Sequence, residues 1–349
     1  MKASPVKSYR PISIWLYIGV GMIMVQVLIG GLTRLTGSGL SITEWKPILG
    51  AFPPMNEQAW QLAFDQYKEI AQFKKLNSHF SLSDFKFIYF WEWFHRDWAR
   101  LMGLVFIFPF LYFLIKKKIK SDMVNPMVIL FLLGALQGTI GWIMVQSGLH
   151  AENLYVSHIR LAVHFISALI LLSYTLWFAM KVSVPGNQIL YVPALKKLNI
   201  WLLILITLQL IYAAFMAGLH AAYAGVTWPD MNGKWIPDGM LTQGSFWEDI
   251  THNLSTVHFI HRGLAYLICI PVIIWTIKAK ELPENSLFKK IRYVPISLLF
   301  LQILLGILTV INTEAEIPIV YAILHQFVGM LFLLVYVMTL FLSRGVQTK

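Results

Sequence analysis

The chain has 349 residues, of which 57% are hydrophobic and only 13% charged, and its mean hydropathy is +0.64. Soluble domains carry about 25% charged residues, so this composition excludes an ordinary soluble protein. A net charge of +11 would suit a nucleic-acid binder, but most lysines stand in short loops between apolar runs, as topology signals do. The single cysteine, Cys269, excludes an internal disulfide and an ordinary cysteine-ligated metal site.

Apolar runs long enough for a helix to cross about 30 Å of hydrocarbon recur along the chain. They predict an all-α membrane protein with eight transmembrane helices at 12–34, 88–115, 124–146, 159–182, 198–220, 254–277, 293–312 and 318–342. The first run is too long for a signal-peptide core and lacks a small-residue cleavage site, so we expect a helix there.

The lysines and arginines predict the orientation of these helices. With eight spans both termini lie on one side, and that side receives 17 of the 28 basic residues. The positive-inside rule therefore predicts that both termini are cytoplasmic.

Two outer loops are long. In residues 35–87, the side chains of Trp60, Phe64 and Tyr67 share one stripe, which predicts an amphipathic helix lying on the membrane surface. Residues 221–253 are rich in aromatic residues and proline, which favours an ordered cap over a flexible connection.

The sequence repeats itself in the two halves of the chain. The matching segments are 94–96 (FHR) with 260–262 (IHR), 136–141 (LQGTIG) with 301–306 (LQILLG), and 160–164 (RLAVH) with 321–325 (YAILH). Because four predicted helices precede the second copy, both copies have the same topology. We therefore expect two tandem four-helix bundles, residues 1–190 and 191–349, related by a pseudo-two-fold axis along the membrane normal.

Four histidines fall within the predicted spans: His95, His164, His261 and His325. Each half has one pair, on its second and fourth helices, about 8–12 Å from the outer end at 1.5 Å per residue. Matched depth on neighbouring helices suits two axial ligands of one heme in a bundle core. The alternative is that each histidine only hydrogen-bonds a neighbouring helix. Pairs without carboxylates suit heme better than a di-iron or zinc centre.

Charged residues flank these histidines. Arg96 and Arg262 follow a predicted ligand directly, and each suits either a heme propionate or the lipid headgroups. Glu92 precedes His95 by three residues, and either takes part in proton-coupled oxidation or orients the histidine. We align His258, one turn before His261, with Trp91 in the first half, and expect apolar residues such as Phe259 opposite Glu92. On this alignment only one half has the acid.

The motifs together resemble the heme A synthase family over essentially the whole chain. The specific segments are 30–47 (GGLTRLTGSGLSITEWKP), 92–96 (EWFHR), 136–142 (LQGTIGW), 261–262 (HR) and 325–326 (HQ). Two departures stand out: the chain lacks the outer-loop cysteine pair of some members, and His220 stands where an acid is common. The first excludes a thiol-based step, and the second affects the loop of the second half rather than the ligands.

The resemblance implies an oxidoreductase that converts the C8 methyl group of heme O to a formyl group by successive hydroxylations, giving heme A for cytochrome c oxidase. It implies that His95 and His164 flank the substrate heme, with Glu92 as the acidic residue of that half. His261 and His325 would ligate a resident heme b that passes electrons. A heme O synthase is the implied source of substrate.

The main alternative is a quinol-linked electron-transfer protein with two bis-histidine hemes and no heme chemistry. A proton-relaying transporter predicts inverted repeats and polar groups at the midplane, whereas this repeat is parallel and its polar groups lie near the outer face. The sequence leaves open the electron donor (a quinol or a ferredoxin-like protein), the source of oxygen and assembly into a homo-oligomer.

Overall fold

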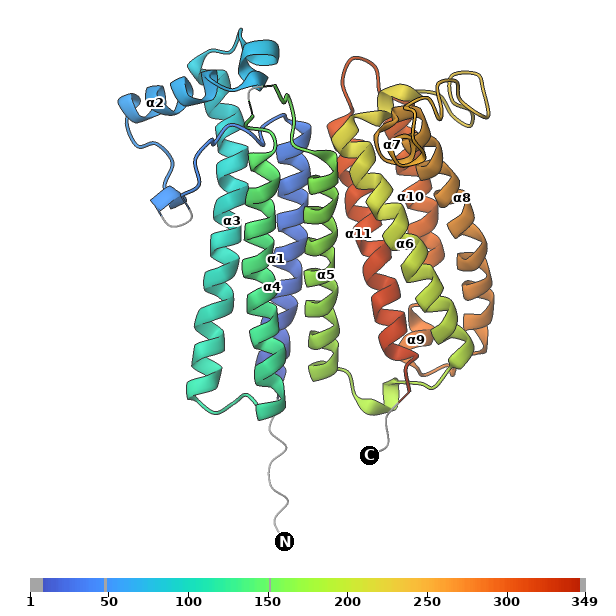
Figure 1. Ribbon diagram of the computed structural model, residues 1–349. Coiled ribbons are helices and arrows are strands. Elements are labelled where there is room, and N and C mark those ends of the chain that lie inside the picture. Colours follow the sequence, from blue (N-terminus) through green and yellow to red (C-terminus); the bar gives the residue numbers. More distant parts are fainter. Residues whose placement is uncertain (1–8, 47–48, 151, 346–349) are drawn as a thin grey trace.

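A computed structural model describes residues 9–46, 49–150 and 152–345 of the chain (Figure 1). Within these residues eight helices are long and apolar enough to cross a membrane. They are α1 Arg10–Leu35, α3 Leu82–Ile115, α4 Ser121–Gln146, α5 His158–Ser183, α6 Pro193–Leu219, α8 Leu254–Lys278, α10 Val294–Ile311 and α11 Ile319–Leu342. The predicted spans and the all-α class are confirmed. Lys2, Lys7, Pro47 and Lys349, which entered the sequence argument, lie outside the described residues.

The helices form two neighbouring groups that share one apolar core. Helices α1, α3, α4 and α5 pack together, as do α6, α8, α10 and α11, and both described ends of the chain lie at the same end of the bundle (Figure 1). Helices α5 and α6 pack across the boundary, and α11 packs against α1 and α5. Side chains such as Val27, Leu172, Leu202 and Tyr336 belong to a single buried cluster. The chain is a multi-pass membrane protein with a continuous interior.

Two polar contacts join the two groups near the outer end. Arg34 of α1 donates to the carbonyl oxygen of Ala217 at the end of α6. Gln326 of α11 donates its side-chain Nε2 to the carbonyl oxygen of Val27 in α1, at 2.8 Å. This contact needs Gly31, because a Cβ there would lie 2.3 Å from Oε1 of Gln326. The boundary is therefore built for close approach.

Two backbone hydrogen bonds also join the groups at the opposite end of the bundle. The linker after α5 pairs with the segment after α11, through Leu190 N to the Leu342 carbonyl (2.8 Å) and Gly345 N to the Leu190 carbonyl (3.0 Å). Nearby, the buried amide of Asn199 accepts from the indole of Trp275 at 2.7 Å and donates to Ser343 at 3.1 Å. Backbone groups at this end are thus satisfied within the protein.

The outer loop of the first half differs from its prediction. Helix α2 (Glu57–Lys68) is amphipathic, but Phe64 and Tyr67 are buried against Phe85 and are not available to a membrane surface. Helix α3 also begins six residues earlier than predicted, at a capping box of Ser81 and Asp84. The physical reason is that the first two turns of α3 project from the bundle and provide the apolar surface that α2 covers.

The loop after α6 is ordered, as predicted. It contains a short turn at Ala221–Ala224 and helix α7 (Phe246–His252). Asn232 donates to the Ala224 carbonyl at 3.2 Å, and Asn253 caps α8 while donating to the Gly239 carbonyl at 2.7 Å. The remaining short helices are the π-turn Phe73–Asn77, the 3₁₀ turns Leu49–Ala51, Gly186–Gln188 and Ala279–Glu281, and α9 Leu287–Lys290.

We predict that Gly31→Ala weakens the boundary between the two groups. The added methyl must displace Gln326, which strands its amide in an apolar setting at a cost of about 1–3 kcal/mol. The midpoint of thermal unfolding in detergent should fall by several degrees. Gly21→Ala in the same helix is the control, since a Cβ there meets nothing within 4 Å. Equal midpoints for the two variants would contradict the prediction.

Candidate active site

Each predicted ligand histidine lies beside a glutamine on the preceding transmembrane helix. The four pairs are Gln26 with His95, Gln137 with His164, Gln209 with His261 and Gln302 with His325, and the amide Nε2 lies 3.1 to 3.3 Å from a ring nitrogen. A polar ring inside hydrocarbon needs such a partner. The same pair therefore occurs four times, twice in each half.

In the first half the glutamines also hold the backbone of the histidine helices. Gln26 and Gln137 donate to the carbonyl oxygens of His95 and His164, at 3.0 and 2.9 Å. The hydroxyl of Ser167 donates to Oε1 of Gln137 at 2.6 Å, which fixes the orientation of that amide. Each glutamine of the first half thus joins two helices while it contacts a histidine ring.

In the second half the two rings face each other at a defined separation. The ring centres of His261 and His325 are 6.4 Å apart, with planes inclined at 75°. Two imidazoles that bind one metal from opposite sides at about 2.0–2.1 Å have centres about 6 Å apart. The Nδ1 of His325 lies 3.0 Å from the Gln302 carbonyl, which can only accept, so Nδ1 carries the proton and Nε2 has the lone pair. The Gln302 amide lies 3.3 Å from this Nε2 and must release it for a metal to bind there. This pair fits the axial ligation of a heme iron.

Glycine gives three of the rings their space. A Cβ built at Gly30, Gly141 or Gly306 would lie 2.8 to 2.9 Å from Cε1 of His95, His164 or His325 respectively, closer than real Cβ atoms approach. Each of these glycines follows the partner glutamine by four residues, and Ala213 follows Gln209 at the same spacing. The rings are therefore held by an amide on one side and by a bare backbone on another.

Sequence reasoning missed half of this arrangement. The repeated segments 136–141 and 301–306 contain Gln137 and Gln302, but they did not predict the bonds to the histidines. Gln26 and Gln209 lie outside the repeated segments. The signal was present: glutamine followed four residues later by glycine or alanine occurs in α1, α4, α6 and α10. The sequence repeat relates the two halves of the chain. The smaller repeating unit is a pair of consecutive transmembrane helices, the first with the glutamine and the second with the histidine.

Glu92 is buried in a network that ties the outer loop to α3. Its carboxylate accepts hydrogen bonds from Ser41 Oγ (2.7 Å), the Ile42 backbone N–H (2.8 Å) and Arg96 (2.6 Å). Arg96 also donates to the carbonyl oxygens of Ile42 (2.9 Å) and Glu44 (3.1 Å). The part of segment 30–47 that follows α1, residues 36–46, is therefore a loop bonded to the histidine helix.

Counted from the histidine, the counterpart of Glu92 is His258, and the earlier alignment of His258 with Trp91 is wrong. Both residues stand three positions before the predicted ligand, and both are buried. Nε of Arg262 donates to Nε2 of His258 at 3.0 Å, as Arg96 donates to Glu92. Polar residues therefore occupy this position in both halves, but only the first carries an acid.

Arg262 repeats the loop contact of Arg96. It donates to the carbonyl oxygens of Asp230 (2.8 Å) and Gly225 (2.7 Å) in the loop before α8. Each guanidinium has five N–H donors, and these contacts use three. Two further arginines near the outer end also donate to carbonyl oxygens: Arg100 to that of Lys46 (3.1 Å) and Arg160 to that of Ile143 (2.8 Å).

Two histidines near the outer loops, His158 and His220, pack against other rings. His158 is buried, with its ring centre 4.6 Å from that of His252. His220 ends α6 in the left-handed conformation (φ 56°) and packs on Tyr155, with ring centres 4.4 Å apart. Burial, and secondarily the positive charge of Arg34, lowers the pKa of His220 to about 4. His220 is therefore neutral at pH 7.

Comparison with known proteins decides the family. The model of the COX15-CtaA family, described as cytochrome oxidase assembly protein, matches residues 13–337. The chain belongs to this family. A heme A synthase of Flavobacterium johnsoniae is 38% identical over 97% of this chain and 98% of its own length. Those of Flavobacterium psychrophilum (39%; 97% and 99%) and Wolbachia pipientis (40%; 91% and 93%) are similarly related.

We predict that Gly141→Ala disturbs the first histidine pair without unfolding the protein. The methyl group would sit 2.8 Å from the His164 ring, so the ring must move by several tenths of an ångström. The purified protein is supplied with heme O and its absorption spectrum is measured. The amount of heme bound at the His95 and His164 pair should fall severalfold. Gly138→Ala, one turn earlier in α4 and with nothing within 4 Å of the added Cβ, should bind as the native chain does.

Proposed function

We propose that this chain is a heme A synthase that oxidises the C8 methyl group of heme O to a formyl group by successive hydroxylations. The observation that carries the proposal is the pair of glutamine-held histidines in each half of a chain matched end to end by heme A synthases. None of the relatives described above bears the name of a quinol-linked electron-transfer protein, the alternative reading of the sequence.

The two halves have distinct proposed tasks. Residues 1–190 form the catalytic bundle and residues 191–349 the bundle with the resident cofactor, related by a pseudo-two-fold axis along the membrane normal. The repeated Gln–His pair and the matching contacts of Arg96 and Arg262 support this arrangement. They recur in the same order along the chain in both halves.

His261 and His325 are the proposed ligands of heme b, and the 6.4 Å between their ring centres supports that role. Heme b supplies a reversible one-electron carrier when bound. Gln209 and Gln302 orient the two rings, and the Gln302 carbonyl holds the proton on Nδ1 of His325. In the first half, His95 and His164 flank heme O.

Glu92 is the proposed acidic group of the catalytic half. Oxidation of a methyl group releases protons, and a carboxylate three residues from His95 is placed to accept one. The second half has His258 at this position, which supports assigning catalysis to the first. Arg96 and Arg262 each retain two N–H donors, which suit the carboxylates of heme propionates.

The remaining assignments follow the charge pattern and the chemistry of the substrate. We place the protein in the bacterial cytoplasmic membrane with both termini in the cytoplasm. Heme O would pass through the lipid phase from a heme O synthase. The electrons would come from a quinol or a ferredoxin-like protein, and a homo-oligomer is compatible with the exposed helix faces.

The proposal is tested by producing the chain together with a heme O synthase. Hemes extracted from the purified protein are identified by chromatography and mass spectrometry. Heme A and its hydroxylated precursor are the expected products. An active preparation that yields neither rejects the enzyme and leaves the electron-transfer alternative.

We predict that histidine variants in the two halves have different effects. His261→Ala and His325→Ala should lose resident heme b, because each removes one axial ligand. His95→Ala and His164→Ala should retain heme b and lose at least about a hundredfold in conversion. Heme b is measured by its reduced absorption spectrum and conversion by chromatography. Full conversion by the His95 variant would overturn the assignment of halves.

A further inference from the structure

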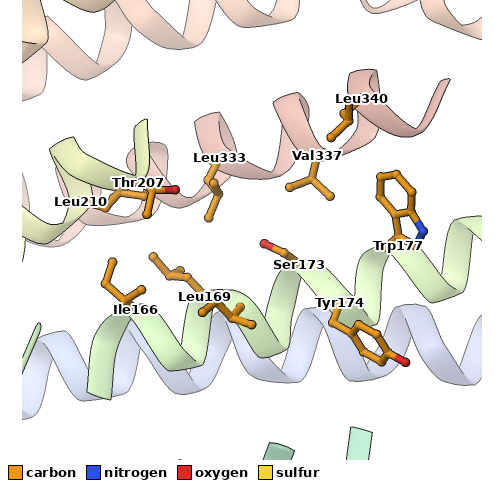
Figure 2. Close-up of a pocket in the computed structure, with 11 residues that line it drawn as sticks. Ile166, Leu169, Ser173, Tyr174, Trp177, Thr207, Leu210, Leu333, Val337 and Leu340 are labelled. Atoms are coloured by element: carbon orange, nitrogen blue, oxygen red, sulfur yellow. The ribbon is translucent and has the colours of Figure 1, made fainter. Parts of the chain in front are cut away.

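A groove runs between the two helix groups, away from the histidine pairs. Its cavity of about 500 Å³ lies between α5, α6 and α11 (Figure 2). It is lined by Ile166, Leu169, Ile170, Ser173, Tyr174, Trp177, Thr207, Leu210, Leu333, Val337 and Leu340. Ile170 is 55% exposed at this depth of the membrane, so the groove opens toward the surrounding lipid.

The chemistry of the lining suits a hydrocarbon chain. From Ile166 to Trp177 the groove follows α5 for about 16 Å, at 1.5 Å per residue. The hydroxyl of Ser173 points toward the gap, whereas that of Tyr174 points away (Figure 2). Thr207 donates its hydroxyl to the Leu203 carbonyl of its own helix at 2.7 Å. Apart from Tyr174 and Trp177 the remaining walls are aliphatic, which disfavours the head of a quinone and favours an acyl chain.

A cation stands at the mouth of the groove, at the end that carries both termini. The guanidinium carbon of Arg344 lies 5.5 Å from the ring centre of Trp177, which lines the groove, and 3.8 Å from that of Phe341. Arg344 forms no ion pair with an acid among the described residues. Its backbone is fixed by the pairing of the neighbouring Gly345 with Leu190. Lys181, in the last turn of α5, adds a second positive charge at this end.

We propose that the groove binds an anionic phospholipid, with one acyl chain between α5 and α11 and its phosphate on Arg344. Basic groups between transmembrane helices at the cytoplasmic face are typical headgroup sites, and tryptophan is typical of the interface. The bound chain fills the cavity between the two helix groups. The inference does not depend on the proposed enzymatic activity.

Native mass spectrometry of the full-length chain in detergent tests this. Phosphatidylglycerol and phosphatidylcholine with identical acyl chains are titrated separately. One phosphatidylglycerol should bind at least about fivefold more tightly, the effect of one basic group near a membrane surface. Arg344→Glu and the milder Arg344→Gln should abolish the preference. Ser173→Phe, which fills the groove, should weaken binding of both lipids.

Arg292→Glu is the matched control, because Arg292 also stacks on an aromatic ring (Tyr293, 4.7 Å) but does not border the groove. It should bind both lipids as the native chain does. Equal affinity of the native chain for the two lipids overturns the proposal, as does an unchanged preference in both Arg344 variants. A co-purified isoprenoid quinone that phosphatidylglycerol does not displace also overturns it. Circular dichroism confirms that each variant remains helical.

Discussion

The hydrogen bond between a glutamine amide and a histidine ring is the contact on which the architecture of this protein depends. Imidazole inside a bilayer is costly unless a neighbouring helix satisfies it. Here the partner always lies on the preceding transmembrane helix, so each bond joins two helices while it aims a ring. In three of the four pairs, glycine four residues further on lets the ring lie against bare backbone. Packing and ligand placement are thus achieved by the same few atoms.

Near the outer loops, each of two arginines likewise makes two kinds of contact at once. Arg96 and Arg262, one position after a predicted ligand, bond to loop carbonyls and to the polar residue one turn before the ligand. The two halves share this geometry but differ in its chemistry, since one has Glu92 and the other His258. Under the proposed function, this difference assigns proton transfer to the half with Glu92 and electron transfer to the half with His258.

Much of this could be predicted from the sequence because a bilayer permits few choices. Helix length, the basic loops and the spaced histidines followed directly from apolar runs and their interruptions. The Gln–His bonds did not, since Gln26 and Gln209 read as isolated polar residues until their helices are placed side by side. The amphipathic stripe of α2 predicted contact with the membrane surface, whereas its apolar face is buried against Phe85 of α3. The match of His258 to Glu92 can be read from the sequence, because each stands three positions before a predicted ligand.

Gln326 has a consequence for how this molecule could have evolved. It adjoins His325, yet its amide is bonded to the Val27 carbonyl in α1, next to the glutamine that holds His95. A fragment beginning at residue 191 would expose that amide to hydrocarbon. Evolution toward two separate bundles would therefore be costly. The two helix groups are held together as one unit.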